Sequence, residues 1–202
     1  MDEQNLIKDA INGDLDAFNR LVLAYQDLAY NVAYRMIGDE ARAEECTQDS
    51  FLSAYRHLST YRGGSFKAWV LRMVTNACYD ELRRQKRRPT IPLEPINDAD
   101  EELESPAWLA SDEPSPEEEI ENMEIDQAIQ HCLKTLMPDF RSVIILVDVE
   151  GLEYEEVAAS IKTPLGTIKS RLARARLKMR DCLQGFKELL PSVYRLDKEG
   201  SQ

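Results

Sequence analysis

The stretch that decides the fold is Gly151–Arg180, with the sequence GLEYEEVAASIKTPLGTIKSRLARARLKMR. Its first part places apolar Val157 and Ile161 one turn apart, beside small alanines that let a second helix approach closely. Thr163 is placed to cap the next helix, and Pro164 suits a first helical turn, where a missing N–H costs little. The stretch therefore predicts a helix-turn-helix.

The second helix of this unit has an apolar side and an opposite side of small and polar residues when it is laid out with the helical period. The apolar seam consists of Leu165, Ile168, Leu172, Ala175 and Met179. The opposite side consists of Gly166, Ser170, Ala173 and Arg174, with Thr167 close by. Cations flank it, Lys169, Arg176 and Arg180 on one shoulder and Arg171 and Lys178 on the other. A helix that recognises bases in the DNA major groove needs this layout. Small residues let the helix backbone come close to the bases, and the flanking cations reach the phosphates.

Charge separates this helix from the segment before it. The chain has 202 residues and a net charge of −12, yet Lys162–Arg180 carries seven basic residues and no acidic one. A solvated basic helix remains the alternative, although such helices usually mix signs. Residues 89–125 hold thirteen acidic residues and no Lys or Arg, so the net charge does not exclude nucleic acid as a partner.

The acidic middle also contains six of the nine prolines and no apolar periodicity. A sequence of this kind buries too little apolar surface to offset the conformational entropy that is lost on folding. Residues 89–122 are therefore predicted to be a flexible linker. Its carboxylates could imitate nucleic acid in the basic cleft of a partner, or the linker could be a plain spacer.

The N-terminal part is helical by its pattern. An apolar stripe from Phe18 to Met36 recurs at steps of three and four, Gly38 ends that helix, and Asp39 is placed to cap a helix that runs to about His57. A glycine loop, residues 59–65, leads into a third helix that ends near Lys86. Another stripe follows the linker and stops at Pro138, and the apolar run 143–147 is predicted to be helix rather than strand because no partner strand exists. The fold class is therefore all-α.

The glycine loop and the third helix combine aromatic and basic residues. Aromatic rings beside cations suit unpaired bases, because stacking contributes about 1–3 kcal/mol per base. Tyr61 is the better stacking candidate, whereas Phe66 and Trp69 fit core packing. The basic cluster at the end of the helix consists of Arg83, Arg84, Lys86, Arg87 and Arg88.

Composition excludes several other classes of protein. No apolar run reaches the roughly 20 residues that cross a bilayer, and the N-terminus lacks a signal-peptide pattern, so a cytoplasmic protein is expected. Four scattered cysteines (Cys46, Cys78, Cys132 and Cys182) predict neither a disulfide framework nor a zinc site, and His131 beside Cys132 is interpreted as incidental rather than as a redox switch. The pattern predicts no catalytic site, metal or cofactor.

Three motifs carry a resemblance to a known family. AEECTQDSFLSAYRHL, YRGGSFKAWVLRMVTNACYDELRRQKRR and GLEYEEVAASIKTPLGTIKSRLARARLKM occur in this order, the last two separated by the linker. The sequence resembles the extracytoplasmic-function (ECF) sigma factors of the sigma-70 family, which direct bacterial RNA polymerase to promoters. The resemblance implies an N-terminal region 2 (residues 1–88), the linker (89–122), a helix-turn-helix region 4 (123–188) and a tail (189–202).

The resemblance also implies partners and site residues. Contacts with the clamp helices of the largest subunit of core polymerase are implied for Glu45, Gln48, Asp49, Phe51 and Leu52. Recognition and melting of the −10 element are implied for Tyr61 and Asn76, beside the basic cluster. Recognition of the −35 element is implied for the second helix of region 4, namely Thr167, Lys169, Ser170, Arg171, Arg174, Arg176 and Lys178. An anti-sigma factor is an inherited expectation, and no small-molecule substrate or membrane insertion is implied.

Two other readings remain open. A stand-alone helix-turn-helix regulator would bind its duplex without polymerase, and a helical adapter would use its basic faces on acidic proteins. The resemblance disagrees with the helical layout on one point, since it places Lys169 among the base-reading residues whereas the layout puts it on a phosphate shoulder.

Overall fold

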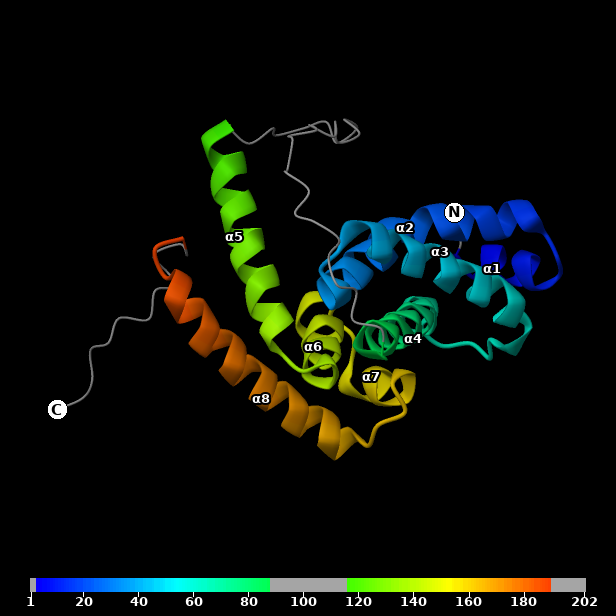
Figure 1. The fold of residues 1–202 in the computed structure, drawn as a ribbon. Helices are drawn as coiled ribbons and strands as arrows, with labels where there is room; N and C mark the ends of the chain where they lie inside the picture. Colours follow the sequence, from blue (N-terminus) through cyan, green and yellow to red (C-terminus); the bar gives the residue numbers. More distant parts are fainter. Residues whose placement is uncertain (1–2, 88–115, 190–202) are drawn as a thin grey trace.

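The computed structural model describes residues 3–87 and 116–189, with side chains described from residue 123 in the second range. The helices of the first range are α1 Glu3–Ile11, α2 Leu15–Ile37, α3 Glu40–His57 and α4 Phe66–Arg87, with a 3-10 turn at Leu58–Thr60. Those of the second range are α5 Pro116–Thr135, α6 Pro138–Ile144, α7 Tyr154–Ser160 and α8 Leu165–Leu183, and a 3-10 turn follows at Gln184–Phe186. Figure 1 shows helices only, which confirms the all-α class for the described ranges.

Local signals set several of these boundaries as predicted. Gly38 ends α2 in the left-handed conformation at φ 75°, which glycine adopts without steric cost. The Asp39 carboxylate then accepts a hydrogen bond from the Arg42 amide and caps α3. The Ser65 hydroxyl does the same for the Ala68 amide at the start of α4.

One other local prediction is wrong. Thr163 does not cap α8, because its hydroxyl donates to the Ile161 carbonyl at 3.2 Å, while the Pro164 carbonyl accepts from the Thr167 amide at 2.8 Å. The turn before α8 instead depends on Lys162, which has a φ of 51°. The prediction that the run 143–147 is helix rather than strand is confirmed, and within it α6 gives way to a π-helical segment at Ile145–Val149.

The linker prediction needs a correction at its end. Helix α5 begins at Pro116, within the segment predicted to be flexible up to residue 122. Proline favours the first position of a helix, because its fixed φ is helical and its missing N–H would have no partner there. The rest of the linker prediction falls on residues outside the described ranges.

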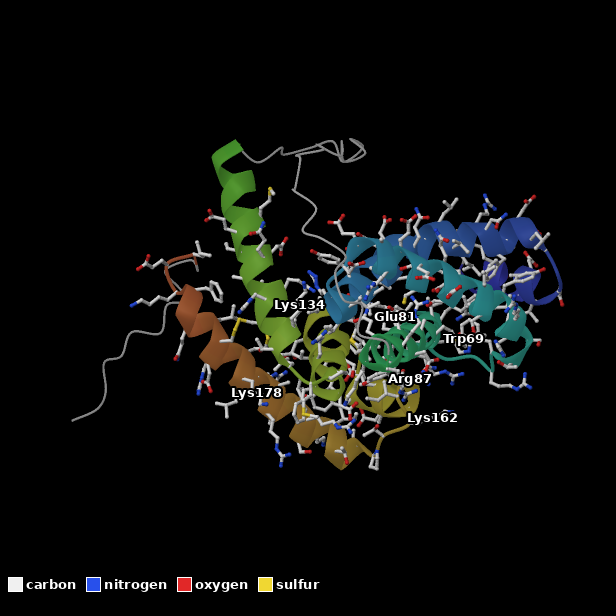
Figure 2. The ribbon with its side chains drawn as sticks, in the orientation of Figure 1. Trp69, Glu81, Arg87, Lys134, Lys162 and Lys178 are labelled. Carbon is white, nitrogen blue, oxygen red and sulfur yellow. A yellow bond between two sulfur atoms is a disulfide. The ribbon has the colours of Figure 1, made fainter. Side chains whose placement is uncertain are left out.

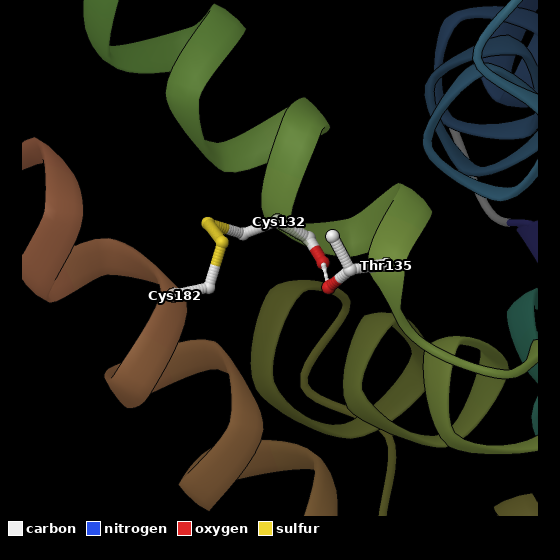
Figure 3. The surroundings of a disulfide bond; sticks show 3 residues. All are labelled: Cys132, Thr135 and Cys182. Carbon is white, nitrogen blue, oxygen red and sulfur yellow. Dashed lines mark hydrogen bonds between the residues drawn. A yellow bond between two sulfur atoms is a disulfide. The ribbon is translucent and has the colours of Figure 1, made fainter.

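The prediction that the cysteines form no disulfide is also wrong. Cys132 in α5 and Cys182 in α8 form a disulfide across 50 residues of chain, with a Cα–Cα distance of 5.7 Å (Figure 3). Spacing gave no signal of it, because the two cysteines approach only when α5 and α8 pack side by side. Cys46 and Cys78 are buried free thiols.

Helices α1–α4 form one bundle and α5–α8 another, and the two lie against each other (Figure 1). Their buried side chains belong to one continuous apolar cluster rather than to two separate cores. None of the helices within the described ranges has the length and apolar character needed to cross a membrane.

Candidate nucleic-acid and polymerase interface

Helix α8 has the two sides that its sequence predicts. Ile168, Leu172, Ala175 and Met179 are buried against the bundle, with exposed fractions of 0 to 8%. Lys169, Ser170 and Arg174 are exposed on the other side, and Thr167 is half-buried. The Ser170 hydroxyl donates to the Thr167 carbonyl at 3.0 Å, one turn before it. The outward face of α8 therefore carries polar and cationic side chains.

The flanking cations do not all point to solvent. Arg171 binds Asp139 of α6 at 2.6 Å, and Arg176 makes two hydrogen bonds to the Asp148 carboxylate at 2.8 and 2.5 Å. These hydrogen bonds raise the pKa of Arg176 above its ordinary value. Lys178 lies over the Phe140 ring, 5.5 Å from its centre.

This pairing divides the cations of α8 into two groups. Arg171, Arg176 and Lys178 contact the preceding helical segments, and the charges of Arg171 and Arg176 are compensated there by Asp139 and Asp148. Among the described residues, no ion pair is recorded for Lys169 or Arg174. Lys169 and Arg174 therefore keep, on the outward face beside Ser170, charge that no acidic side chain in the described ranges compensates.

The loop before α4 forms an aromatic cluster. Tyr61 lies edge-on to Phe66 and Trp69, with ring centres 5.5 and 5.7 Å away, and its hydroxyl donates to the Gly64 carbonyl at 2.7 Å. Phe66 is buried and Trp69 is half-buried, which agrees with core packing. Burial, and to a lesser extent the charge of Glu3, raise the pKa of Tyr61. Tyr61 lines an open hollow of about 380 Å³ beside α1.

The basic cluster at the end of α4 is organised by acidic residues of α3 and α4. Arg84 contacts the Glu81 carboxylate at 2.5 Å and Glu45 of α3 at 3.3 Å, and Arg83 pairs with Asp80 at 3.0 Å. Arg87 donates to the Arg83 carbonyl, and Lys86 is exposed. Figure 2 labels Glu81 and Arg87 on this helix. Arg88 lies outside the described ranges.

Glu81 is a residue that the sequence reasoning missed. Its side chain is 7% exposed and lies beside two arginines, Arg42 of α3 and Arg84 of α4. Burial alone would raise its pKa, but hydrogen bonds from Gln85 and Arg84 and the charge of Arg42 hold the pKa below its ordinary value. A charged carboxylate under an arginine cluster was not detectable from spacing, because Arg42 belongs to another helix.

A groove of about 510 Å³ between α3 and α4 brings two predicted sites together. Asn76 is exposed along this groove, opposite Glu45 and Asp49, and Arg84 and Arg87 continue its wall. The residues that the resemblance assigns to polymerase therefore border one that it assigns to the −10 element.

The predicted polymerase-binding residues share an exposed face of α3, with one exception. Glu45, Gln48, Asp49 and Leu52 are exposed, and Leu52 shows 55% of its surface although it is apolar. Phe51 is half-buried and packs against the core. The exposed face of α3 therefore combines carboxylates with apolar surface, and Phe51 packs beneath it against the core.

Comparison with known proteins identifies the family of the chain. The family model for Sigma-70 region 2 matches residues 21–88, and that for Sigma-70 region 4 matches residues 126–179. The chain is 33% identical over 183 residues to the RNA polymerase sigma-H factor of Pseudomonas aeruginosa, covering 90% of this chain and 94% of that one. The chain belongs to the sigma-70 family.

Further relatives place it among the ECF sigma factors. It is 34% identical over 170 residues to the ECF RNA polymerase sigma factor SigE of Mycolicibacterium smegmatis, covering 84% of this chain and 62% of that protein's length. Its fold is similar to that of the sigma factor RpoE of Bartonella quintana, solved in complex with the anti-sigma factor NepR. The TM-score is 0.62 and the identity 25%, covering 84% of this chain and 98% of that one.

Polar contacts between the two bundles of this sigma factor were not predicted. Lys67 of α4 lies 3.4 Å from the Glu150 carboxylate and donates to its carbonyl, and the Tyr79 and Ser142 hydroxyls are 2.7 Å apart. Buried Arg141 donates to the carbonyls of Met36, Lys134 and Leu136, at the ends of α2 and α5. Burial lowers the pKa of Arg141, while these carbonyls satisfy much of its guanidinium. A lone arginine in an apolar run gives no sequence signal of this role.

Proposed function

We propose that this sigma factor binds core RNA polymerase and directs it to promoters that carry a −35 and a −10 element. The observation that supports this most is the outward face of α8, where exposed Lys169, Ser170 and Arg174 stand opposite a buried seam. A helix of this kind reads base edges with a few side chains while flanking cations reach phosphates. Thr167 borders the same face, whereas Arg171, Arg176 and Lys178 approach phosphates from the flanks.

The −10 element is assigned to α4 and the loop before it. Asn76 has the exposure that contact with an unpaired base requires, and Lys86 and the neighbouring arginines suit the phosphate backbone. Tyr61 offers a ring to a base at the mouth of its hollow. Opening duplex costs about 1.4 kcal/mol per base-pair step, so a bubble of about a dozen pairs needs roughly 15–20 kcal/mol. Stacking one or two bases on aromatic rings returns only a few kcal/mol, so a large partner must hold the separated strands.

That partner is core polymerase, bound through the exposed face of α3. Carboxylates beside exposed Leu52 suit a helical partner with basic and apolar side chains. The polymerase performs the synthesis, and we assign no catalytic step to the sigma factor. The chain is expected to act in the cytoplasm, where polymerase is found, and to be held inactive by an anti-sigma factor, as the NepR complex of the Bartonella protein suggests.

Transcription by purified core polymerase from a promoter library, with and without this chain, tests the proposal. We expect new start sites that depend on the chain and share two upstream elements. Tight, sequence-specific duplex binding by the chain alone, with no change in start sites, would instead identify a stand-alone regulator. Failure to bind either polymerase or DNA would favour the helical adapter.

A further inference from the structure

The disulfide between Cys132 and Cys182 joins two helices of region 4 at one end. Cys132 lies in α5 and is fully buried, and Cys182 lies in the last turn of α8 and is half-buried (Figure 3). The Thr135 hydroxyl donates to the Cys132 carbonyl beside it. One sulfur of the pair is thus closer to solvent than the other.

The compartment makes this bond unusual, a point that rests on the proposed function. A protein that works with RNA polymerase is surrounded by thiol reductants, and disulfides there are usually transient or redox-sensing rather than permanent. We propose that Cys132 and Cys182 form a reversible thiol–disulfide modification site, exchanging with low-molecular-weight thiols and disulfides, whose oxidation fastens the end of α8 to α5.

The exchange begins at Cys182, because it is half-buried whereas Cys132 is fully buried. The Cys182 thiolate attacks a disulfide RSSR, forming a mixed disulfide and releasing RS⁻, which takes the proton that Cys182 lost. Cys132 then loses its proton, attacks the Cys182 sulfur and releases a second RSH. Two protein thiols and one RSSR give one protein disulfide and two RSH, and reduction is the reverse.

The consequence of oxidation is local, because the rest of α8 is held by other contacts. Its seam up to Met179 is buried, and Arg171 and Arg176 bind Asp139 and Asp148. Beyond Met179, the contacts with α5 include the disulfide and the edge-on packing of Phe186 on His131, with ring centres 5.5 Å apart, and Leu183 and Phe186 are only partly buried against the apolar cluster. Reduction is therefore expected to loosen residues 180–186 and to leave Lys169, Ser170 and Arg174 in place.

The test uses the full chain equilibrated with reduced and oxidised glutathione at graded ratios. Acid quenching, alkylation and peptide mass analysis give the oxidised fraction of each cysteine, and hydrogen exchange gives the protection of residues 180–186. We expect Cys132 and Cys182 to convert together and reversibly in one two-electron transition. We also expect amide exchange in residues 180–186 to accelerate at least tenfold on reduction, while residues 167–174 change less than threefold.

Two variants control the experiment. Cys132→Ser with Cys182→Ser removes the response, whereas Cys46→Ser with Cys78→Ser retains it. A pair that stays oxidised in the most reducing buffer, or reduced in the most oxidising one, overturns the proposal. So does unchanged exchange of residues 180–186 when the pair switches. None of these measurements uses polymerase or promoter DNA, so they are independent of the transcription assay.

Discussion

Arg174 and Arg176 stand two residues apart on α8, yet only Arg176 has an acidic partner among the described residues. Arg176 is bound on two nitrogens by Asp148, whereas Arg174 is exposed on the outward face. A side chain already bound inside the protein must break that contact to reach DNA, so Arg174 is the stronger candidate for direct contact. This difference was invisible in the sequence, since Asp148 precedes the helix-turn-helix.

Replacing Arg174 by Ala should weaken binding of the holoenzyme to a −35 duplex by roughly 1–3 kcal/mol, or about five- to 150-fold in Kd. Fluorescence anisotropy of labelled promoter, titrated at several salt concentrations, measures this loss. Arg180→Ala is the matched control, because Arg180 carries the same charge but pairs with Asp181 at 3.0 Å near the end of the helix. We expect less than a threefold effect from it, and equal losses in the two variants would contradict the assignment.

Glu81 carries a prediction about acid stability. Its pKa is lowered in the folded protein from an ordinary value of 4.5, so its contribution to stability is complete above that pH and is lost as the pH falls through the folded-state pKa. Glu81→Gln should therefore reduce the free energy of unfolding by about 1–3 kcal/mol at pH 7. The two proteins should converge as the pH falls below 4.

Urea denaturation of Glu81→Gln and the parent at pH 7 and below pH 4 checks this. Glu45→Gln serves as the control, since its carboxylate contacts the same Arg84 from an exposed position and should change stability by less than about 1 kcal/mol. A deficit in Glu81→Gln that persists unchanged in acid would mean that shape, and not charge, is what the site requires.

At the scale of helices, the Cys132–Cys182 bond closes a loop that contains α6, α7 and most of α8. A cross-link over 50 residues removes denatured-state entropy equivalent to about 4 kcal/mol in the loop-closure account. Cys132→Ser with Cys182→Ser should therefore lower the free energy of unfolding by roughly 2–4 kcal/mol under oxidising conditions. Denaturation with and without dithiothreitol measures it. Parent and variant should become nearly equal once the reductant is present, and a difference that survives reduction would point to packing instead.

The sequence was informative about helices and much less about what joins them. The stripe in α2, the Gly38 stop, the Asp39 cap and the seam of α8 were predicted correctly, because each depends on residues within a few turns of one another. The disulfide, Arg141 and the Asp148 contact were not, because each joins residues that only packing brings together. The Thr163 prediction failed for a local reason, since its hydroxyl is used by the preceding turn.

The predictions for the candidate binding sites divide in the same way, between what a single helix determines and what packing between helices determines. Exposure of Lys169, Ser170 and Arg174 followed from the helical period, as did the shared face of Glu45, Gln48, Asp49 and Leu52. That Arg171 and Arg176 are compensated inside the chain could not be predicted, because their acidic partners lie on other elements. The roles of these residues in binding DNA and polymerase remain predictions.

The arrangement of the whole molecule sets a condition on promoter binding. Two elements centred near −10 and −35 are about 25 base pairs apart, which is roughly 85 Å along B-DNA. In this structure α7 lies directly against α4, and Trp69 and Arg72 of α4 share a hollow of about 190 Å³ with Glu156 and Ala159 of α7. We therefore expect the two bundles to separate when the holoenzyme reads both elements, and the contacts between them to oppose that step.

Lys67→Ala combined with Tyr79→Phe removes two polar contacts across this interface, the one to Glu150 and the one to Ser142. The variant should fold, because Tyr79 keeps its ring and the apolar cluster is intact, but the closed arrangement should lose about 1–3 kcal/mol. Small-angle X-ray scattering of the free chain should then give a larger radius of gyration, and holoenzyme should form promoter complexes faster. Arg83→Ala is the control for the scattering measurement alone, because it removes an ion pair within α4 that lies away from the interface but belongs to the cluster assigned to promoter DNA. An unchanged radius of gyration in the double variant would show that apolar packing alone keeps the bundles together, and opening would then have to be driven by polymerase.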